Sequence, residues 1–215
     1  MIDRRNLMAV VGMAPFAGWT SARAFTEDSK PNAAPKTSRE VLRDRYFPNV
    51  VLTTHEGKKV RFYDDLLKDK IVVLNFMYAS CEGVCPVITA NLMTVQKLLG
   101  ERVGRDIFIY SITVRPEEDS PKVLKEYARM HGIGPGWLIL TGEPKDVELL
   151  RAKLGFVDPN PEVDRDKARH SGVIRFGNEP LQRWGACPGQ SAPDWIVASI
   201  KSVDWPKSEQ AKRAG

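Results

Sequence analysis

Apolar residues occur along this chain in two patterns: short continuous runs, and longer stretches in which they recur three and four positions apart. A continuous apolar run of strand length is typical of a strand buried on both faces of a sheet. Apolar positions at helical spacing indicate helices that cover such a sheet. Four runs predict strands: Ile71–Tyr78, Ile107–Val114, Trp137–Gly142 and Ser171–Gly177.

Helical patterns lie between and after these runs. The first begins near Cys85 and stops at Gly100. Ser120 and Pro121 suit the N-cap and the first residue of a helix that runs to about Met130. Two further helices are predicted over Pro144–Leu154 and Pro193–Val203. Because strands alternate with helices, the sequence predicts an α/β fold with a mostly parallel central sheet and helices on both faces.

The segments at the two ends of this pattern set the expected domain bounds. The stretch "VVLTTHEGKKVRFY" predicts a hairpin whose turn includes His55. Residues 25–45 are polar, charged and interrupted by prolines, so they are predicted to form a flexible linker. We expect one domain over residues 46–204, followed by a polar tail over residues 205–215.

Residues 1–24 predict an export signal. A short charged start is followed by the apolar stretch Leu7–Trp19 and by small residues that end in Ala22-Arg23-Ala24, the layout of a secretory signal. The apolar stretch is shorter than the ~20 residues of a membrane-spanning helix, which disfavours a permanent anchor. The pair Arg4-Arg5 resembles a twin-arginine signal, and an amphipathic first helix is the alternative. We expect the mature protein in a bacterial periplasm, where disulfides persist.

Composition narrows the function classes. The chain is 42% hydrophobic and 27% charged, which suffices for a full core without disulfides. The formal net charge is +5, to which the predicted signal contributes +2. The remaining basic residues are interleaved with acidic ones, so we interpret them as a solvated surface and expect no nucleic-acid partner. Glu117, Glu118 and Asp119 are interpreted as a solvated loop, and no phosphate-binding loop or Ser/His/Asp signature is found.

Cys81 and Cys85 follow the predicted strand Ile71–Tyr78 and flank the start of the next helix. This strand end is where open α/β sheets place their chemistry, and exposed N–H groups at a helix start lower a thiol pKa. Two thiolates four positions apart suit a soft ion such as Cu(I), and they can also close into a disulfide. A purely structural disulfide over so short a loop would stabilise the fold weakly. A metal site and a redox pair both remain open.

These residues resemble the Sco family of copper chaperones, which have a thioredoxin-like fold. The similarity covers residues 46–200, and its most specific element is Cys81-Glu82-Gly83-Val84-Cys85-Pro86 after a strand. Two further elements are "SITVRPEEDSPKVLKEYARMHG" and "ARHSGVIRF". The resemblance implies that Cys81, Cys85 and His170 bind one copper ion, as Cu(I) and as Cu(II).

The chain departs from the family at several positions. Gly83 stands where the family often has an acidic residue, and Arg115 stands where its strand usually ends in an aspartate. The stretch "RFGNEPLQRWGACPG" also differs from the commoner late segment. Most members are membrane-anchored, whereas this chain has the pattern of a cleavable signal.

The resemblance implies a metallochaperone that passes copper to a copper enzyme. The expected recipient is the copper A site of cytochrome c oxidase, on its subunit II, with nitrous oxide reductase as another candidate; the copper donor stays open. The alternative is a thiol–disulfide oxidoreductase that keeps the recipient's cysteines reduced. Three intervening residues weigh against a thioredoxin-type pair, which has two. Copper sensing would use the same site.

The remaining cysteine and histidines have other expected roles. His55 in a hairpin turn and His131 at a helix end are expected to face solvent or to cap their elements. Cys187 is an odd thiol, and we expect a buried bystander because Trp184 and Trp195 near it indicate apolar packing; pairing between chains is the alternative. A closed zinc site is excluded, because it needs four ligands and no second closely spaced pair is present.

Overall fold

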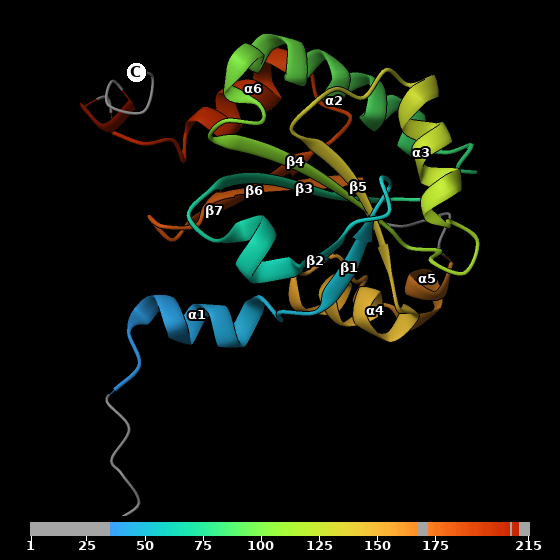
Figure 1. Cartoon of the computed structure of the whole chain (residues 1–215), viewed down its shortest axis with the longest axis horizontal. Coiled ribbons are helices and arrows are strands. Elements are labelled where there is room, and N and C mark those ends of the chain that lie inside the picture. Colours follow the sequence, from blue (N-terminus) through green and yellow to red (C-terminus); the bar gives the residue numbers. More distant parts are fainter. Residues whose placement is uncertain (1–34, 167–171, 207, 211–215) are drawn as a thin grey trace, which may run out of the picture. The chain divides into compact units, whose positions relative to one another are not determined.

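The computed structural model describes residues 35–166, 172–206 and 208–210, drawn in colour in Figure 1. Residues Lys36–Gly215 belong to one compact unit. The predicted export signal over residues 1–24 lies outside the described residues. Within the described residues, no helix is both long enough and apolar enough to cross a membrane.

The described residues form a seven-stranded sheet with the order β2-β1-β5-β4-β3-β6-β7. Its centre is parallel, because β3 pairs in parallel with β4, and β4 with β5. Every residue of β3 is buried, as its continuous apolar run predicts. The strands are β1 (Val51–Thr54), β2 (Lys59–Arg61), β3 (Ile71–Met77), β4 (Ile107–Thr113), β5 (Trp137–Gly142), β6 (Val173–Asn178) and β7 (Arg183–Pro188).

The α/β fold class is confirmed, with one difference in the sheet. Only the three central strands are parallel; β1 pairs antiparallel with β2 and β5, and β6 pairs antiparallel with β3 and β7. Short turns join β1 to β2 and β6 to β7, and a short turn can return a chain only to an antiparallel neighbour. Strand β7 was not predicted, since Cys187 is its one buried residue and its apolar pattern is therefore weak.

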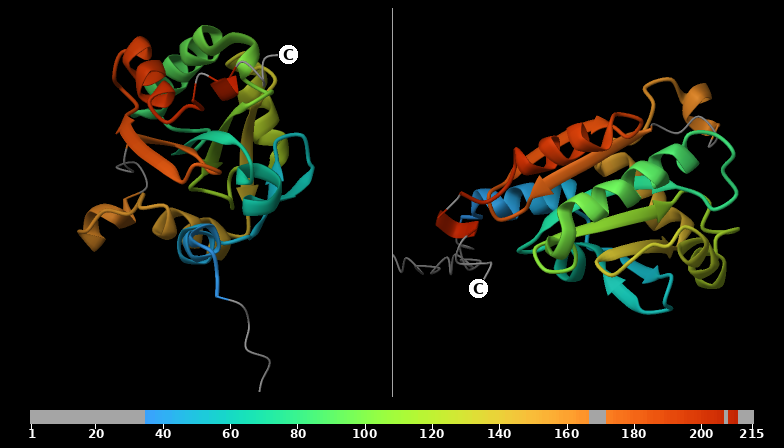
Figure 2. Two further views of the ribbon diagram at one scale, coloured as in Figure 1. Left: turned by 90° about the vertical axis from the view of Figure 1, so that its left-hand side faces the viewer. Right: turned by 90° about the horizontal axis from the view of Figure 1, so that it is seen from above.

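Helices cover both faces of the sheet. On one face α2 (Cys85–Leu99) and α6 (Pro193–Lys201) lie side by side, as the right-hand view of Figure 2 shows. Ile88 and Ile196 from these helices pack on Val73 of β3 in one core cluster. The second core cluster lies on the other face and includes Leu74 of β3. It receives side chains from the π-helical turn Phe62–Leu67, α3 (Pro121–Met130) and α4 (Pro144–Lys153).

Helix α1 (Ser38–Tyr46) corrects the prediction of a flexible linker over residues 25–45. Its start is a capping box: the Thr37 hydroxyl accepts from the N–H of Glu40, and the Glu40 carboxylate accepts from the N–H of Thr37 at 2.8 Å. This S/T-x-x-E signature is visible in the sequence, but no residue of the helix is buried, so its apolar periodicity is weak. Phe47 directly after the helix is buried in the core.

The predicted helix bounds otherwise agree with the structure to within two residues. Ser120 is the N-cap of α3, and its hydroxyl accepts from the N–H of Val123 at 3.4 Å. Short helical segments that were not predicted are α5 (Pro161–Arg165), the 3-10 turn Gly100–Arg102 and the π-helical turn Phe62–Leu67. At the other end Trp205 is buried, so the packed domain extends one residue into the predicted polar tail.

Candidate metal centre

The cysteine pair lies at the carboxyl end of the parallel strands. Strand β3 ends at Met77, Cys81 lies in the loop that follows, and Cys85 is the first residue of α2. Neither cysteine is in a disulfide, and both are buried, with 8% of Cys81 and 2% of Cys85 exposed. The loop is turned back on itself by the N–H of Cys81, which donates to the Tyr78 carbonyl at 3.2 Å. Sequence reasoning placed the pair correctly, at a strand end and a helix start.

The surroundings of Cys81 favour its thiolate. Burial acts to raise the pKa of this thiol, but hydrogen bonds from the Cys85 thiol, from the N–H groups of Cys85 and Gly83, and from the Tyr78 hydroxyl outweigh it. The pKa of Cys81 is therefore lowered from its ordinary value. Helix α2 has no side-chain cap at its start, so its first N–H groups are available for a negatively charged sulfur.

Cys85 has the opposite tendency. Burial raises its pKa, and its hydrogen bond to Cys81 and the negative charge there raise it further. Of the two coupled thiols, Cys81 is therefore the one that loses its proton first, and Cys85 keeps its proton to higher pH. Such a pair has one ready nucleophile, which is also one ready soft ligand, and a second thiol that must lose its proton to take part.

Tyr78 and Arg115 form one side of the site. The Tyr78 ring is 5% exposed, and the Arg115 guanidinium lies over it, 4.2 Å from the ring centroid. Burial and the hydrogen bond with Cys81 raise the pKa of Tyr78 to about 12, so its hydroxyl stays protonated and remains a donor to the thiolate. Arg115 also pairs with Glu118 at 3.2 Å. No sequence pattern indicates the role of Tyr78, which was predicted only as the last residue of an apolar strand.

Asp119 fixes the loop that carries Cys81. Its carboxylate accepts from the N–H of Ala79 at 3.1 Å and from the Thr113 hydroxyl, and it therefore joins the chain after β3 to the end of β4. The expectation of a solvated loop is wrong for Asp119, which is 2% exposed. Its burial is offset by the two donors that bond to its Oδ2, which a sequence pattern alone cannot show.

The third predicted ligand, His170, lies outside the described residues. Two residues later, a Cβ added at Gly172 would lie 3.5 Å from Cδ1 of Ile88 and 3.9 Å from Cγ2 of Val84. The backbone at Gly172 therefore runs past the start of α2. Among the residues that the structure describes, no three His, Cys, Asp or Glu side chains gather as a metal site.

The other histidines have structural contacts. Nδ1 of His55 accepts from the N–H of Ile139 at 3.1 Å, which ties the hairpin turn to β5. His131 is the C-cap of α3, and its ring packs on Tyr127 with the centroids 4.2 Å apart. These contacts agree with the expected capping roles.

Cys187 is buried, as expected, with 3% exposed, but the expected reason is wrong. It packs with Ile174 and Ile196 on the α2 and α6 face of the sheet. Trp195 is 51% exposed, and Trp184 packs against the core cluster of the other face. Burial raises the pKa of Cys187 to about 11.

Comparison with known proteins identifies the family. The sequence profile of SCO1/SenC proteins matches residues 42–203. The chain belongs to the SCO1/SenC family. It is similar to the SCO1 protein homolog of Bacillus subtilis, with 36% identity over 88 residues that cover 40% of this chain and 44% of that protein. It is also similar to the SCO2-like protein of Rickettsia felis, with 30% identity over 65% of this chain and 69% of that protein. The match with the Bacillus subtilis protein spans less than half of that protein's length.

Solved structures confirm the thioredoxin-like Sco fold. BsSco, described as a Sco protein of cytochrome c oxidase assembly with a disulfide switch, superposes with a TM-score of 0.58 at 26% identity. The superposition covers 72% of this chain and 90% of that one. Yeast Sco1 with copper bound superposes with a TM-score of 0.55 at 26% identity, over 75% of this chain and 91% of that one.

Proposed function

We propose that this protein binds one copper ion through Cys81, Cys85 and His170 and passes it to a copper protein outside the cytoplasm. The observation that carries the proposal is the cluster of backbone and side-chain donors around Cys81, beside the Cys85 thiol, which lowers the pKa of Cys81. A family relative of the same fold, yeast Sco1, has been solved with copper bound. In this proposal copper is the ion that the protein carries and hands on, and not a resident cofactor.

The two sulfurs suit Cu(I), which prefers soft ligands. The Cys81 thiolate would bind first, and binding to Cys85 would release its proton, so the affinity should rise with pH. His170 would add an imidazole, which suits Cu(II) as well. The course of the chain at Gly172, past the start of α2, supports a place for His170 near the two sulfurs.

Transfer requires that the ion be reachable by a partner's ligands. Glu82 and Gly83, between the two cysteines, are exposed, so the loop itself faces solvent. A recipient's thiolates could then replace Cys81 and Cys85 one at a time. Because BsSco is described as a cytochrome c oxidase assembly protein, we propose the copper A site of that enzyme as the recipient. Nitrous oxide reductase is the other candidate, and the predicted export signal supports an encounter with either recipient in the periplasm.

A second function rests on the same thiolate. Cys81 can attack a disulfide of the recipient and form a mixed disulfide, which releases one recipient thiolate. Cys85, after losing its proton, then attacks the Cys81 sulfur and releases the second recipient thiolate. The recipient gains two electrons, Cys81 and Cys85 become a disulfide, and an external dithiol must reduce them again. The disulfide switch described for BsSco favours this candidate.

One experiment separates the two functions. Copper-loaded protein is mixed with an apo copper A domain, and metal-free reduced protein is mixed with the same domain in its disulfide form. The chaperone predicts copper transfer in the first mixture. Disulfide reduction in the second mixture without any copper transfer in the first would make the metal incidental and reject the leading proposal.

A further inference from the structure

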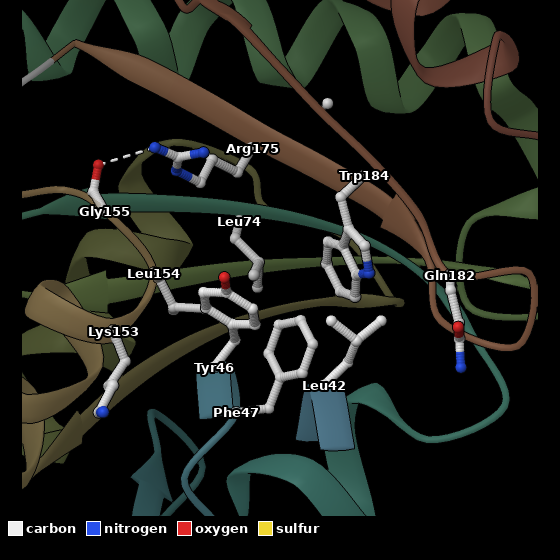
Figure 3. A pocket seen from close by; sticks show the side chains of 11 residues that line it. Leu42, Tyr46, Phe47, Leu74, Lys153, Leu154, Gly155, Arg175, Gln182 and Trp184 are labelled. Atoms are coloured by element: carbon white, nitrogen blue, oxygen red, sulfur yellow. Dashed lines mark hydrogen bonds between the residues drawn. The ribbon is translucent and has the colours of Figure 1, made fainter. Parts of the chain in front are cut away.

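A cavity of about 420 Å³ lies between α1, the end of α4 and strands β6 and β7 (Figure 3). One wall is apolar and largely aromatic: Phe47 and Trp184 have ring centroids 4.6 Å apart, with Leu42 and Tyr46 beside them. Two cations, Lys153 and Arg175, line it together with Gly155. No Asp or Glu is among its lining residues.

The floor of the cavity depends on two glycines. A Cβ at Gly177 would lie 2.1 Å from the Trp184 ring, so only glycine on β6 lets this ring lie flat across the strand. A Cβ at Gly155 would lie 2.7 Å from Nη2 of Arg175. Gly155 has a φ of +70°, and its carbonyl accepts from Nη2 at 2.8 Å. The two glycines thus leave room for the indole of Trp184 and the guanidinium of Arg175 beside the cavity.

The cations of the cavity lack anionic partners. Within the part of the chain that the structure describes, neither Lys153 nor Arg175 forms an ion pair, although most other arginines there do. Arg175 lies over the Phe156 ring at 5.3 Å, and its Nε is shielded from solvent with no hydrogen-bond partner. A half-buried guanidinium without an anionic partner, lining a cavity together with a lysine, is a binding group for an anion.

Helix α1, which contributes Leu42 and Tyr46 to this wall, is held in place. Arg39 on α1 donates from Nε to Glu179 at 2.7 Å, and a second bond from its Nη2 reaches the same carboxylate. The hydroxyl of Tyr63 and the N–H of Asp69 also donate to Glu179, at 2.7 Å and 3.0 Å. Because these bonds fix the helix, the cavity is formed before any ligand arrives.

We propose that this cavity binds a small amphipathic carboxylate, with the carboxylate between Lys153 and Arg175 and an apolar body along Phe47 and Trp184. The volume equals that of roughly fourteen water molecules at about 30 Å³ each, which is room for about a dozen non-hydrogen atoms. Decanoate has this size and charge. This site is separate from the proposed copper site. Trp184 pairs with Gly177, which lies beside the first half of β3, whereas Cys81 lies beyond the other end of that strand.

The test is a calorimetric titration of the purified, reduced full chain with sodium decanoate below its micelle concentration. We expect one saturable site per chain. Decyltrimethylammonium, which has the same tail and a positive head, should not bind. The double variant Lys153→Gln/Arg175→Gln should weaken decanoate binding roughly tenfold or more, since it removes charge-assisted hydrogen bonds. The variant Leu42→Trp, which fills the cavity, should abolish binding.

A matched control carries the same change of charge on α4 and on β7, the strand that pairs with β6. Lys145 on α4 and Arg183 on β7 are exposed and do not line the cavity, so Lys145→Gln/Arg183→Gln should bind decanoate as the parent does. If loss of Arg175 lowers the melting temperature, the single variant Lys153→Gln decides, with about threefold weaker binding expected because Lys153 is exposed. Three results would overturn the proposal: no saturable binding, equal binding of the positively charged amphiphile, or equal weakening in the control variant.

Discussion

The loop after β3 and strand β7 each bury a cysteine, with 8% of Cys81 and 3% of Cys187 exposed. Burial alone acts in the same direction at both places, because a thiolate is less stable away from water. At Cys187 burial is the one cause, and the pKa rises to about 11. At Cys81 the Cys85 thiol, the N–H groups of Cys85 and Gly83 and the Tyr78 hydroxyl supply donors, and the pKa falls. The donors around a buried thiol, and not its burial, therefore decide whether it is reactive.

The largest expected difference between the two regions is in copper affinity. Cys81→Ser and Cys85→Ser should each lower Cu(I) affinity by more than about 100-fold, the most that loss of an outer-shell contact usually costs. Cys187→Ser should leave affinity and stoichiometry unchanged. Anaerobic competition with a Cu(I) chelator measures both. A loss of affinity in Cys187→Ser comparable with that in Cys81→Ser would break the comparison.

The next difference concerns alkylation of the reduced, metal-free protein. Thiolates react and thiols do not, so a lowered pKa moves the rise of the rate to lower pH. At pH 7.5 iodoacetamide should modify Cys81 more than about 100-fold faster than Cys187, whose thiolate is scarce below a pKa of about 11. Mass spectrometry of peptides from timed samples gives the two rates. Equal rates in the folded protein would contradict the account.

Tyr78→Phe sharpens the cause of this difference. The variant removes one donor to the Cys81 thiolate and keeps the ring under Arg115, so the pKa of Cys81 should rise toward its ordinary value. Alkylation of Cys81 at pH 7.5 should slow roughly tenfold. Tyr127→Phe is the matched control, because its hydroxyl bonds with Thr89 at 2.8 Å and not with a cysteine. If both variants reacted at the parent rate, Tyr78 would have no part in the site.

The smallest predicted effect tests the contact of α1 with the rest of the domain. Burial acts to raise the pKa of Glu179, but the hydrogen bond from Arg39 and the other donors outweigh it, and the pKa is lowered. A carboxyl group whose pKa is lowered by folding stabilises the folded state at pH values above its ordinary pKa of 4.5. This stabilisation is lost as the pH falls through the lowered pKa of the folded state. Arg39→Gln should therefore cost about 1–2 kcal/mol at pH 7 and less at pH 3, since solvent screens the third of Arg39 that is exposed.

Urea unfolding at the two pH values measures this effect. Arg43→Gln is the control on the same helix, because its pair with Asp44 is exposed and should contribute little. A cost for Arg39→Gln that does not change with pH would show that the helix is held by packing alone.

Much of the fold was predictable because its central elements have strong local signals. The continuous run of β3 predicts a strand buried on both faces, and Ser120-Pro121 predicts the start of α3. Strand β7 and helix α1 were missed for the same physical reason: each lies at the margin of the domain and buries little. A pattern of apolar positions cannot indicate an element that has few of them.

The two sulfur ligands of the site were predictable from the sequence, whereas the residues that surround them and hold their loop were not. Cys81 and Cys85 can be located from the strand before them and the helix after them. Asp119 and Tyr78 could not, because their roles depend on donors and acceptors that are distant in sequence, such as Ala79 forty residues before Asp119. The contact between Gly172 and the start of α2 is likewise a product of the tertiary fold.

The most direct test of the central claim is X-ray absorption of the protein loaded with one equivalent of Cu(I). The account predicts two sulfur ligands and one nitrogen ligand, and it predicts that His170→Ala loses the nitrogen and keeps the two sulfurs. The Cys187→Ser variant should give the spectrum of the parent. A copper ion with no nitrogen ligand, or a spectrum that is unchanged in His170→Ala, would contradict it.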